Sequence, residues 1–433
     1  MESRKRPRKE EKAVFSNVEN DDEFDKSAYS MHHVAQTGAP CLSFDVIADK
    51  LGANRTQFPH TAYLVAGTQA SLANRNKLIV TKMSNLNKIK IKTKENEDEE
   101  EDEDDDDDDD DDSSDSSDDE DDAEKPNMIF ASVKQKSCIN RVRARNVNET
   151  TLAATWSESG SVDIWNLTDQ LNALDDPQRM VAYLRREKAP KPAFTFTGHS
   201  TEGFALDWSL IKPGYLATGD CNKCIHVWKP QEGGTWQIDE RPYESHTGSV
   251  EDVQWSPNEA NVFASCSVDK SIRVWDVRTP KEAMLVVADA HDSDVNVISW
   301  NRTDPFIVSG GDDGVIKVWD LKLIETKKPV AVFKHHTAPV TSVEWNPNDS
   351  TVFAASGGDD QLTQWDLSVE KDGEMETEDE DEDEDETKDL PPQLLFVHEG
   401  QREIKELHWH PQIPGVVIST ANTGFNVFRT ISV

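Results

Sequence analysis

Histidine and aspartate recur together in the C-terminal half of the chain, and such pairs can carry out general acid–base catalysis. The aspartate follows the histidine by 22 or 23 residues, and a tryptophan follows the aspartate by six. Three sets share this pattern: His246, Asp269 and Trp275; His291, Asp313 and Trp319; His336, Asp359 and Trp365. A catalytic pair is needed once, whereas these sets recur at one phase of a repeat. The recurrence therefore predicts a structural network of buried hydrogen bonds that supports turns.

No other group of residues predicts a catalytic or metal site. The sequence has no Gly-rich phosphate loop and no nucleophile with a base beside it. "CNKC" at Cys221–Cys224 has the spacing of zinc ligands, but one pair supplies only half of a four-ligand site. We therefore expect no catalytic residue, no metal and no cofactor, which makes an enzyme the least favoured class. The five scattered cysteines do not form a disulfide framework, which favours a reducing compartment.

Two acidic runs dominate the charge of the chain, which is −38 in total. Residues 95–124 contain 24 acidic and no basic residues, and residues 370–389 contain 14 acidic and two basic residues. Without these runs 46 acidic residues face 44 basic ones, so the rest of the chain is nearly neutral. Because such runs repel themselves and bury no core, we expect two disordered acidic loops. No apolar run reaches membrane-spanning length, and no membrane contact is expected.

The acidic runs predict a strongly basic partner. A loop of 30 residues reaches up to roughly 100 Å when fully extended, much farther than a folded acidic patch acts at physiological salt. The expected client-binding residues are Glu101, Asp104, Asp108, Asp112, Asp118, Glu120, Glu380, Asp383 and Glu386. The alternative is that the runs only aid solubility. Ser116 and Ser117 each have an acidic residue three positions later, a context that suits phosphorylation by an acid-directed kinase.

The N-terminus, "MESRKRPRKEEK", has six Lys or Arg in twelve residues. No apolar core follows it, so it does not have the pattern of a secretory signal. The basic cluster of Lys5, Arg6, Arg8 and Lys9 fits nuclear import, and the alternative is a purely solvated tail. We expect residues 1–27 to form a charged, disordered tail.

The sequence after residue 198 contains five similar segments, and their step is 45 to 47 residues until the last. Each segment opens with a histidine, soon reaches a tryptophan and has a second aromatic residue 19 or 20 positions later. This period, with short alternating strands and Gly/Asp turns, predicts a propeller of four-stranded blades. "SVDKSIRVWD", "SGGDDGVIKVWD" and "SGGDDQLTQWD" resemble the consensus of the WD-repeat family. In the segment with Trp228, Asn222 stands where the others have Asp, so we expect a weaker network there.

Earlier blades are degenerate but can be aligned. "APCLSFDV" matches "APVTSVEW", and "INRVRARN" matches "VTSVEWNP". Inner strands are then expected to start near residues 41, 139, 204, 250, 295, 340 and 404. The last blade lacks an outer strand, and Ala28–Gln36 has the phase to supply it and close the ring. The expected fold is all-β, a seven-bladed WD-repeat propeller over residues 28–433 with a short N-terminal extension.

Three inserts fall between the third and fourth strands of their blades. They are residues 95–124 in blade one, residues 169–192 in blade two, which are expected to be partly helical, and residues 370–389 in blade six. In an antiparallel blade these connections emerge at the same end as the loops between the first and second strands. Both acidic runs are therefore expected to leave one end of the ring.

Beyond the repeat, three stretches resemble the glutamate-rich WD-repeat proteins, a family of nucleolar ribosome-assembly factors. They are "GAPCLSFDVIADKLG", "RTQFPHTAYLVAGTQA" and "EIKELHWHPQIPGVVISTANTGFNVFRTISV", and the resemblance covers nearly the whole chain outside the acidic loops. It implies a protein of the nucleus and nucleolus. It also implies a chaperone for a newly made, basic large-subunit ribosomal protein, universal protein three, which it would deliver to pre-60S particles.

A histone-binding chaperone is the second function, because the family is related to the histone-binding WD proteins and histones are also basic. Those relatives use a long N-terminal helix and an insert in blade six, whereas the residues before Ala28 are charged and poor in apolar positions. An adaptor, such as a ubiquitin-ligase substrate receptor, is open on fold alone. "NKIKIKTK" at Asn87–Lys94 could touch RNA, but a strand edge guarded by lysines is favoured. We expect a monomer that does not bind nucleic acid directly.

Overall fold

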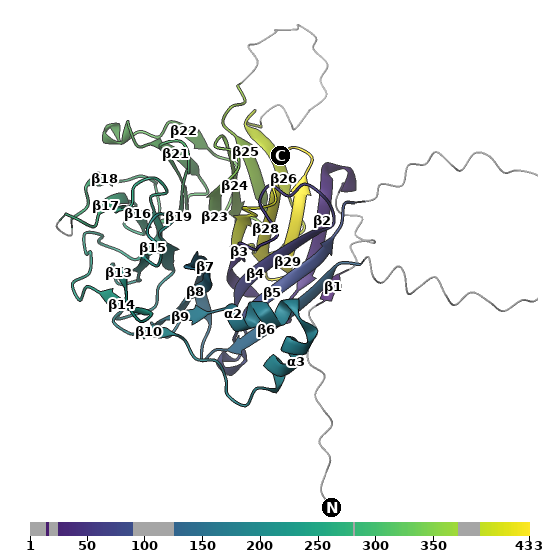
Figure 1. Ribbon diagram of the computed structural model, residues 1–433. Coiled ribbons are helices and arrows are strands. Elements are labelled where there is room, and N and C mark those ends of the chain that lie inside the picture. Colours follow the sequence, from purple (N-terminus) through teal and green to yellow (C-terminus); the bar gives the residue numbers. More distant parts are fainter. Residues whose placement is uncertain (1–13, 17–24, 90–124, 280–281, 371–389) are drawn as a thin grey trace, which may run out of the picture.

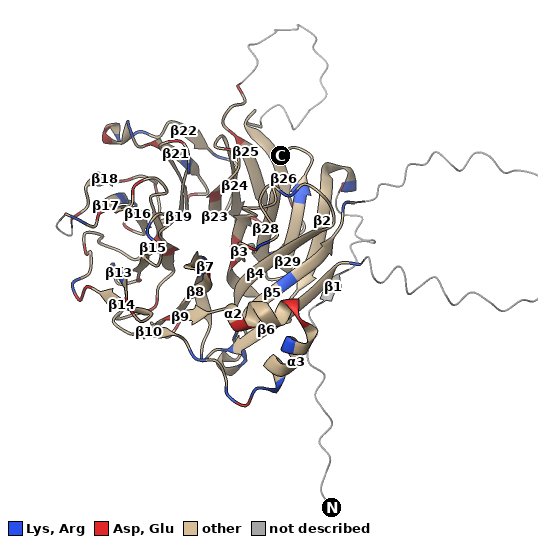
Figure 2. Ribbon diagram, viewed as in Figure 1, with Lys and Arg blue, Asp and Glu red and all other residues tan. Residues whose placement is uncertain are grey.

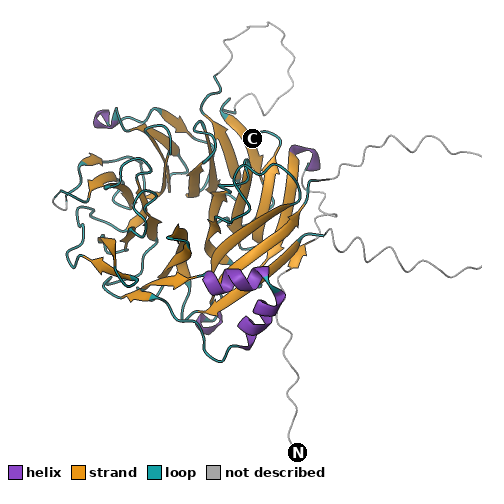
Figure 3. Ribbon diagram, in the orientation of Figure 1, coloured by secondary structure: helices purple, strands orange, loops and turns teal. Residues whose placement is uncertain are grey.

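The structure is a computed structural model that describes residues 14–16, 25–89, 125–279, 282–370 and 390–433. These residues form seven antiparallel sheets around a common centre (Figure 1). Figure 3 shows that nearly all of the regular structure is strand, with a pair of helices beside one blade. The all-β, seven-bladed propeller expected from the sequence is confirmed.

Each blade is numbered here from its innermost strand outward. Blade one holds β3 (Cys41–Ile47), β4 (His60–Thr68), β5 (Lys77–Leu86) and β6 (Asn127–Lys134); blade two holds β7 (Ile139–Val147), β8 (Thr150–Ser157), β9 (Val162–Asn166) and β10 (Phe194–Phe196). Blade three holds β11 (Ala205–Trp208), β12 (Leu216–Gly219), β13 (Ile225–Gln231) and β14 (Thr235–Ile238); blade four holds β15 (Val250–Trp255), β16 (Val262–Ser267), β17 (Ile272–Asp276) and β18 (Leu285–Val287). Blade five holds β19 (Val295–Trp300), β20 (Phe306–Gly311), β21 (Ile316–Asp320) and β22 (Ala331–Phe333); blade six holds β23 (Val340–Trp345), β24 (Val352–Gly357), β25 (Leu362–Asp366) and β26 (Leu394–His398).

Blade seven is built from both ends of the described chain. Its inner strands are β27 (Glu406–Trp409), β28 (Val416–Ala421) and β29 (Gly424–Thr430), and its outer strands are β2 (Tyr29–Gln36) and β1 (Val14–Ser16). β2 pairs antiparallel with β29, with His32 opposite Phe428. β1 then pairs antiparallel with β2 as a fifth strand, so Val14–Ser16 form a strand although they fall in the stretch expected to be disordered. The ring is therefore closed by backbone hydrogen bonds between segments almost 400 residues apart.

The helices connect strands rather than cover the ring. α2 (Thr168–Asp175) and α3 (Pro177–Arg185) lie between β9 and β10, and single 3-10 turns occur at Lys26–Ala28, Ala73–Arg75 and Ile324–Thr326. α3 begins at Pro177, and the Asp176 side chain accepts hydrogen bonds from the first backbone N–H groups of the helix. No helix of the described residues has the length and apolar character needed to cross a bilayer.

The core consists of apolar layers between neighbouring blades. Between blades three and four, for example, Ala217 and Val227 pack with Trp255 and Phe263, all of them buried. Alternate residues of each strand face opposite sides of its sheet, so each blade buries one face against the preceding blade and the other face against the next blade. This explains why the second strands, such as β16 and β24, are buried at every position.

The structure brings each His–Asp–Trp set together. His246 Nδ1 lies 2.9 Å from Asp269 Oδ2, and His246 Nε2 lies 2.7 Å from Ser265 Oγ, which also accepts from the Trp275 indole. Blades five and six repeat this arrangement; their sets are His291, Asp313, Ser309 and Trp319, and His336, Asp359, Thr363 and Trp365. Burial lowers the pKa of each histidine. In these three blades the network joins the aspartate of a turn to the second and third strands through hydrogen bonds.

One expectation about this network is wrong. Asn222 was expected to weaken it in blade three, but a different residue supplies the carboxylate. His199 Nδ1 lies 2.8 Å from Asp220 Oδ2, and Thr218 Oγ1 joins His199 to the Trp228 indole. Asp220 stands two positions earlier in the turn, and its other oxygen accepts from the backbone of the same turn. Counting six residues back from the tryptophan, as in the other blades, therefore does not find this aspartate.

We predict that Asp220→Ala lowers the free energy of unfolding by about 1–3 kcal/mol, because buried His199 loses its partner. Asn222→Ala is the matched control, since Asn222 is exposed and its side chain donates to the Ser200 hydroxyl at the surface. Urea unfolding of both variants measures the difference. Equal losses in the two variants would show that the carboxylate at position 220 has no special role.

A second histidine lies at the ring closure. Asn426 Nδ2 donates to His398 Nε2 at 3.0 Å, which leaves Nδ1 to donate to the Tyr29 hydroxyl at 2.7 Å. The His398 ring also stacks on Phe428, with ring centroids 4.1 Å apart. Burial, with the nearby His32, lowers the pKa of His398 to about 3, and burial lowers the pKa of His32 to about 4. The closing strand is thus held next to histidines that resist protonation.

This geometry predicts acid sensitivity. His32 and His398 have a lower pKa in the folded than in the unfolded chain. Their contribution to the free energy of unfolding is therefore fully present above about pH 6.5 and is lost as the pH falls toward 4. His398→Gln should reduce the slope of unfolding free energy against pH by about one proton, roughly 1.4 kcal/mol per pH unit. Urea unfolding between pH 4.5 and 8 measures this slope, and an unchanged slope would contradict the role of His398. Some pH dependence should remain in the variant, because burial also lowers the pKa of His60 to about 4 and that of His410 to about 3.

Candidate functional site

Most of the expected binding residues lie outside the described part of the chain. The import cluster at Lys5, Arg6, Arg8 and Lys9, the two serines and all nine acidic candidates belong to residues 1–13, 90–124 and 371–389. The described strands fix where the acidic runs attach. The first run lies between β5 and β6 and the second between β25 and β26, so each connects a third strand to a fourth. α2 and α3 lie in the same kind of connection in blade two.

The helical insert of blade two packs on blade one, beside the strands that flank the first acidic run. Lys82 Nζ of β5 lies 2.7 Å from Asp175 Oδ1 of α2, and the Tyr183 hydroxyl of α3 donates to the Ser132 carbonyl of β6 at 3.0 Å. The opposite face of α3 is open, with Leu184 68% exposed. Figure 2 shows Lys and Arg on α3 and along the loop that follows it.

The centre of the ring is lined by polar side chains of the inner strands. In five of the seven blades, among the described residues, a side chain near the end of the inner strand accepts a hydrogen bond from a backbone N–H of the next blade. The acceptor and donor pairs are Asp45 and Ala144, Asp207 and Trp255, Gln254 and Trp300, Ser299 and Trp345, and Glu344 and Trp409. In the two remaining blades the equivalent positions hold Arg143 and His408.

Arg143 is paired across the ring with a buried carboxylate. Glu406 Oε1 of blade seven lies 2.8 Å from Arg143 Nη2 and 2.6 Å from Arg141 Nη1 of blade two. Its other oxygen accepts from the Phe44 backbone N–H of blade one at 2.8 Å. Burial alone would raise the pKa of Glu406, but Arg143 and Arg141 hold it well below its usual range. One carboxylate therefore connects three blades.

His408 completes this cluster from blade seven. Its Nδ1 lies 2.8 Å from Glu344 Oε2, and its Nε2 lies 3.7 Å from Glu406 Oε1. Burial alone would lower its pKa, but the charge of Glu344, the hydrogen bond to Glu344 and the nearby charge of Glu406 raise the pKa of His408 to about 10. His408 is therefore a cation at neutral pH, and its charge balances part of the acidic lining.

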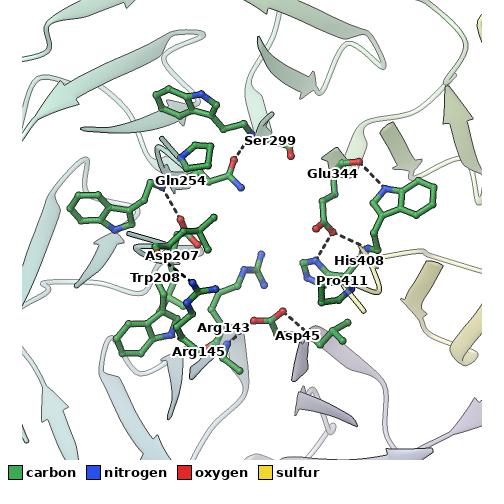
Figure 4. A pocket seen from close by; sticks show the side chains of 18 of the residues that line it. Asp45, Arg143, Arg145, Asp207, Trp208, Gln254, Ser299, Glu344, His408 and Pro411 are labelled. Carbon is green, nitrogen blue, oxygen red and sulfur yellow. Dashed lines mark hydrogen bonds and ion pairs between the residues drawn. The ribbon is translucent and has the colours of Figure 1, made fainter. Parts of the chain in front are cut away.

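These strands enclose a cavity of about 440 Å³ that residues from all seven blades line (Figure 4). Its rim contains Leu210, Pro257, Arg302 and Pro411, which follow the ends of inner strands. The cavity therefore opens at the end of the ring where first and second strands connect. Third-to-fourth connections emerge at the same end, so the two acidic runs attach at this end of the ring, on the outer strands of their blades.

Comparison with known proteins identifies the family. The chain is 46% identical over 417 residues to "Protein HEAT STRESS TOLERANT DWD 1" of Arabidopsis thaliana, covering 94% of this chain and 88% of the relative. It is 43% identical over 418 residues to "Ribosome assembly protein rrb1" of Schizosaccharomyces pombe, covering 94% and 81%. It is 46% identical over 428 residues to "Glutamate-rich WD repeat-containing protein 1" of Dictyostelium discoideum, covering 98% and 86%. The chain belongs to the glutamate-rich WD-repeat family.

The chain also has more distant relatives that are named for histone binding. A family profile for the histone-binding protein RBBP4, which also covers a component of the CAF1 complex, matches residues 19–87. A second profile, "Eukaryotic translation initiation factor eIF2A", matches residues 237–369, which hold four-stranded blades. "Histone-binding protein MSI1" of Saccharomyces cerevisiae is 26% identical over 235 residues, covering 53% of this chain and 50% of the relative.

The charged centre of the ring was missed by sequence reasoning. Arg141 and Glu406 are 265 residues apart, and no repeat pattern links them. A signal was present, since charged residues stand near the ends of inner strands at positions that face the centre of a propeller. The cysteine pair contributes nothing here: Cys221 and Cys224 are free, and the described residues contain no group of three potential ligands that could hold a metal.

We predict that Glu406→Gln lowers the free energy of unfolding by about 3–5 kcal/mol, because it removes the buried carboxylate that pairs with the partly buried Arg141 and Arg143. Glu403→Gln is the matched control, since Glu403 is exposed and its carboxylate forms a surface pair with Lys405 at 3.2 Å. Urea unfolding at pH 7 compares the two variants. A loss for Glu406→Gln no larger than that of the control would contradict the importance of this cluster.

Proposed function

We propose that this protein is a ribosome-assembly factor of the nucleus and nucleolus that does not act as an enzyme. In this proposal it holds a newly made, strongly basic large-subunit ribosomal protein, universal protein three, and delivers it to pre-60S particles. The observation that carries the proposal is 43% identity over 94% of the chain to a protein named for ribosome assembly. The two acidic runs supply the chemistry that a basic client requires.

The attachment points support a capture role for the acidic runs. Blades one and six carry them, with only blade seven between, and both runs attach at one end of the ring. Together the two runs hold 38 acidic residues, whereas the rest of the chain is nearly neutral. Charge of this kind mainly accelerates association. In the same proposal the basic N-terminal cluster directs nuclear import, and phosphorylation of Ser116 and Ser117 would add to the negative charge.

Histone binding is the second candidate, favoured by the match of residues 19–87 to the histone-binding profile. Against it, the described residues between 25 and 40 hold one 3-10 turn and the strand β2 rather than a long helix. Purification from nuclease-treated nuclear extract separates the two functions. One ribosomal protein near stoichiometry supports the proposal, whereas core histones near stoichiometry would replace it with the second candidate.

We predict that deleting Asp104–Glu120 leaves the melting temperature unchanged, since an all-polar, like-charged run contributes no apolar residue to a core. The deletion should slow association with the basic client and flatten its dependence on salt. Deleting Thr377–Glu386 as well should slow association further. Stopped-flow mixing with purified universal protein three at low and physiological salt measures both effects.

The control replaces the acidic residues of both segments with Ser and Gly at constant length, which removes charge but keeps the tether. It should behave like the double deletion. If the double deletion associates at the wild-type rate at both salt concentrations, the runs act only on solubility and the capture role is wrong.

A further inference from the structure

Asp45, Asp207 and Asp252 line the central cavity without an ion-pair partner among the described residues. Glu406 and Glu344 are paired with Arg141, Arg143 and His408, which come from blades two and seven. The opposite wall, on blades three and four, holds Asp207 and Asp252 (Figure 4 shows Asp207). Within the described residues neither of these aspartates has an ion-pair partner.

Backbone amides are the hydrogen-bond donors to these two carboxylates. Asp207 Oδ2 accepts from the Trp255 N–H at 2.7 Å. Asp252 accepts from the Val253 N–H at 2.9 Å and the Ile298 N–H at 3.2 Å. Both side chains touch the cavity but lie deep in the ring. Burial outweighs the attraction of the nearest arginines, so it raises the pKa of Asp207 to about 7 and that of Asp252 above its usual range. The surroundings therefore disfavour the charged forms of these two carboxylates, and a cation bound beside them would restore their charge.

We propose that the cavity binds one lysine or arginine side chain of the basic client, with Asp207 and Asp252 accepting its N–H groups. The inference rests on the proposed function, since it names the folded contact that the client makes. A volume of about 440 Å³ lies in the usual range of ligand sites, roughly 300–1,000 Å³. An ammonium or guanidinium group is the chemistry that neutralises two partly buried carboxylates without a metal.

The rim limits what enters. Arg145 lines the cavity and donates to the Leu210 carbonyl at 3.2 Å, and Arg302 lines it from blade five. These cations limit how much further positive charge the cavity can accept. The cavity therefore selects a single long basic side chain on an extended segment, whereas the acidic runs select only for positive charge.

The two features act on different steps. Long-range attraction by the acidic runs raises the association rate, whereas a buried, hydrogen-bonded ion pair slows dissociation. Both lie at one end of the ring, so a client captured by the runs is already close to the mouth of the cavity. Loss of the cavity contact should then leave association unchanged and accelerate dissociation.

The test uses the full chain and the double variant Asp207→Asn with Asp252→Asn. Asparagine keeps an acceptor for the backbone N–H groups, so the variant should melt no lower than the wild type, because an incompletely compensated charge has been removed. Glu259→Gln is the matched control, because Glu259 is exposed in the connection between β15 and β16 at the same end of the ring.

The first probe is acetyl-arginine amide, with acetyl-citrulline amide as its neutral isostere and Mg²⁺ as the competing cation. Arginine amide should raise the melting temperature of the wild type and of Glu259→Gln, and at least tenfold more of it should be needed for the double variant. Equal stabilisation of wild type and double variant, or equal stabilisation by the citrulline compound, would overturn the proposal. Stabilisation by Mg²⁺ alone, lost in the double variant, would replace it with a metal site.

The second probe is universal protein three. The double variant should release it at least tenfold faster than the wild type and bind it with an unchanged association rate. Faster release from Glu259→Gln to the same degree would overturn the proposal. If arginine amide binds in the cavity but the wild-type chain does not bind the ribosomal protein, the cavity site is supported and the proposed client is wrong.

Discussion

Each blade of this propeller is a separate sheet, so its inner strand is an edge strand. Backbone N–H groups of that strand that face the neighbouring blade have no strand to pair with, and leaving them unpaired inside the ring is costly. Side chains of the preceding blade provide the acceptors. Asp207 serves the Trp255 amide in this way, and Ser299 serves the Trp345 amide. Blade-to-blade packing, and with it the closed ring, depends on these side-chain acceptors.

The constraint explains why charge gathers at the centre of the ring. Carboxylates are strong acceptors for backbone amides, but buried carboxylates need cations nearby. Blade two places Arg143 where most blades have an acceptor, and Arg143 with Arg141 reaches Glu406 across blade one. That pairing links the blade that contains both chain ends to the first half of the ring. Because both arginines are bound to Glu406, the aspartates of blades three and four feel their charge without forming an ion pair.

The repeat of apolar and aromatic residues was sufficient to predict the fold from the sequence, because each blade must bury the same pattern of side chains. The starts of the inner strands and the closing strand at residues 28–36 were predicted within about two residues of β11, β27 and β2. The turn in blade three was mispredicted, since the carboxylate comes from Asp220, two positions before the expected place. The Glu406 cluster could not be predicted, because it depends on which inner strands face one another across the ring. The acidic runs were recognised by composition alone, and their role stays a prediction.

Long-range attraction and local recognition require different structures. A run of like charges attracts any basic chain, so it gives speed but little discrimination among the many basic proteins of a nucleus. A rigid cavity with two fixed carboxylates can discriminate, because an incorrect partner leaves them unpaired. The propeller can combine both, since its third-to-fourth connections take no part in contacts between inner strands. Long inserts at those positions change the surroundings of the cavity without changing the acceptors that hold the blades together.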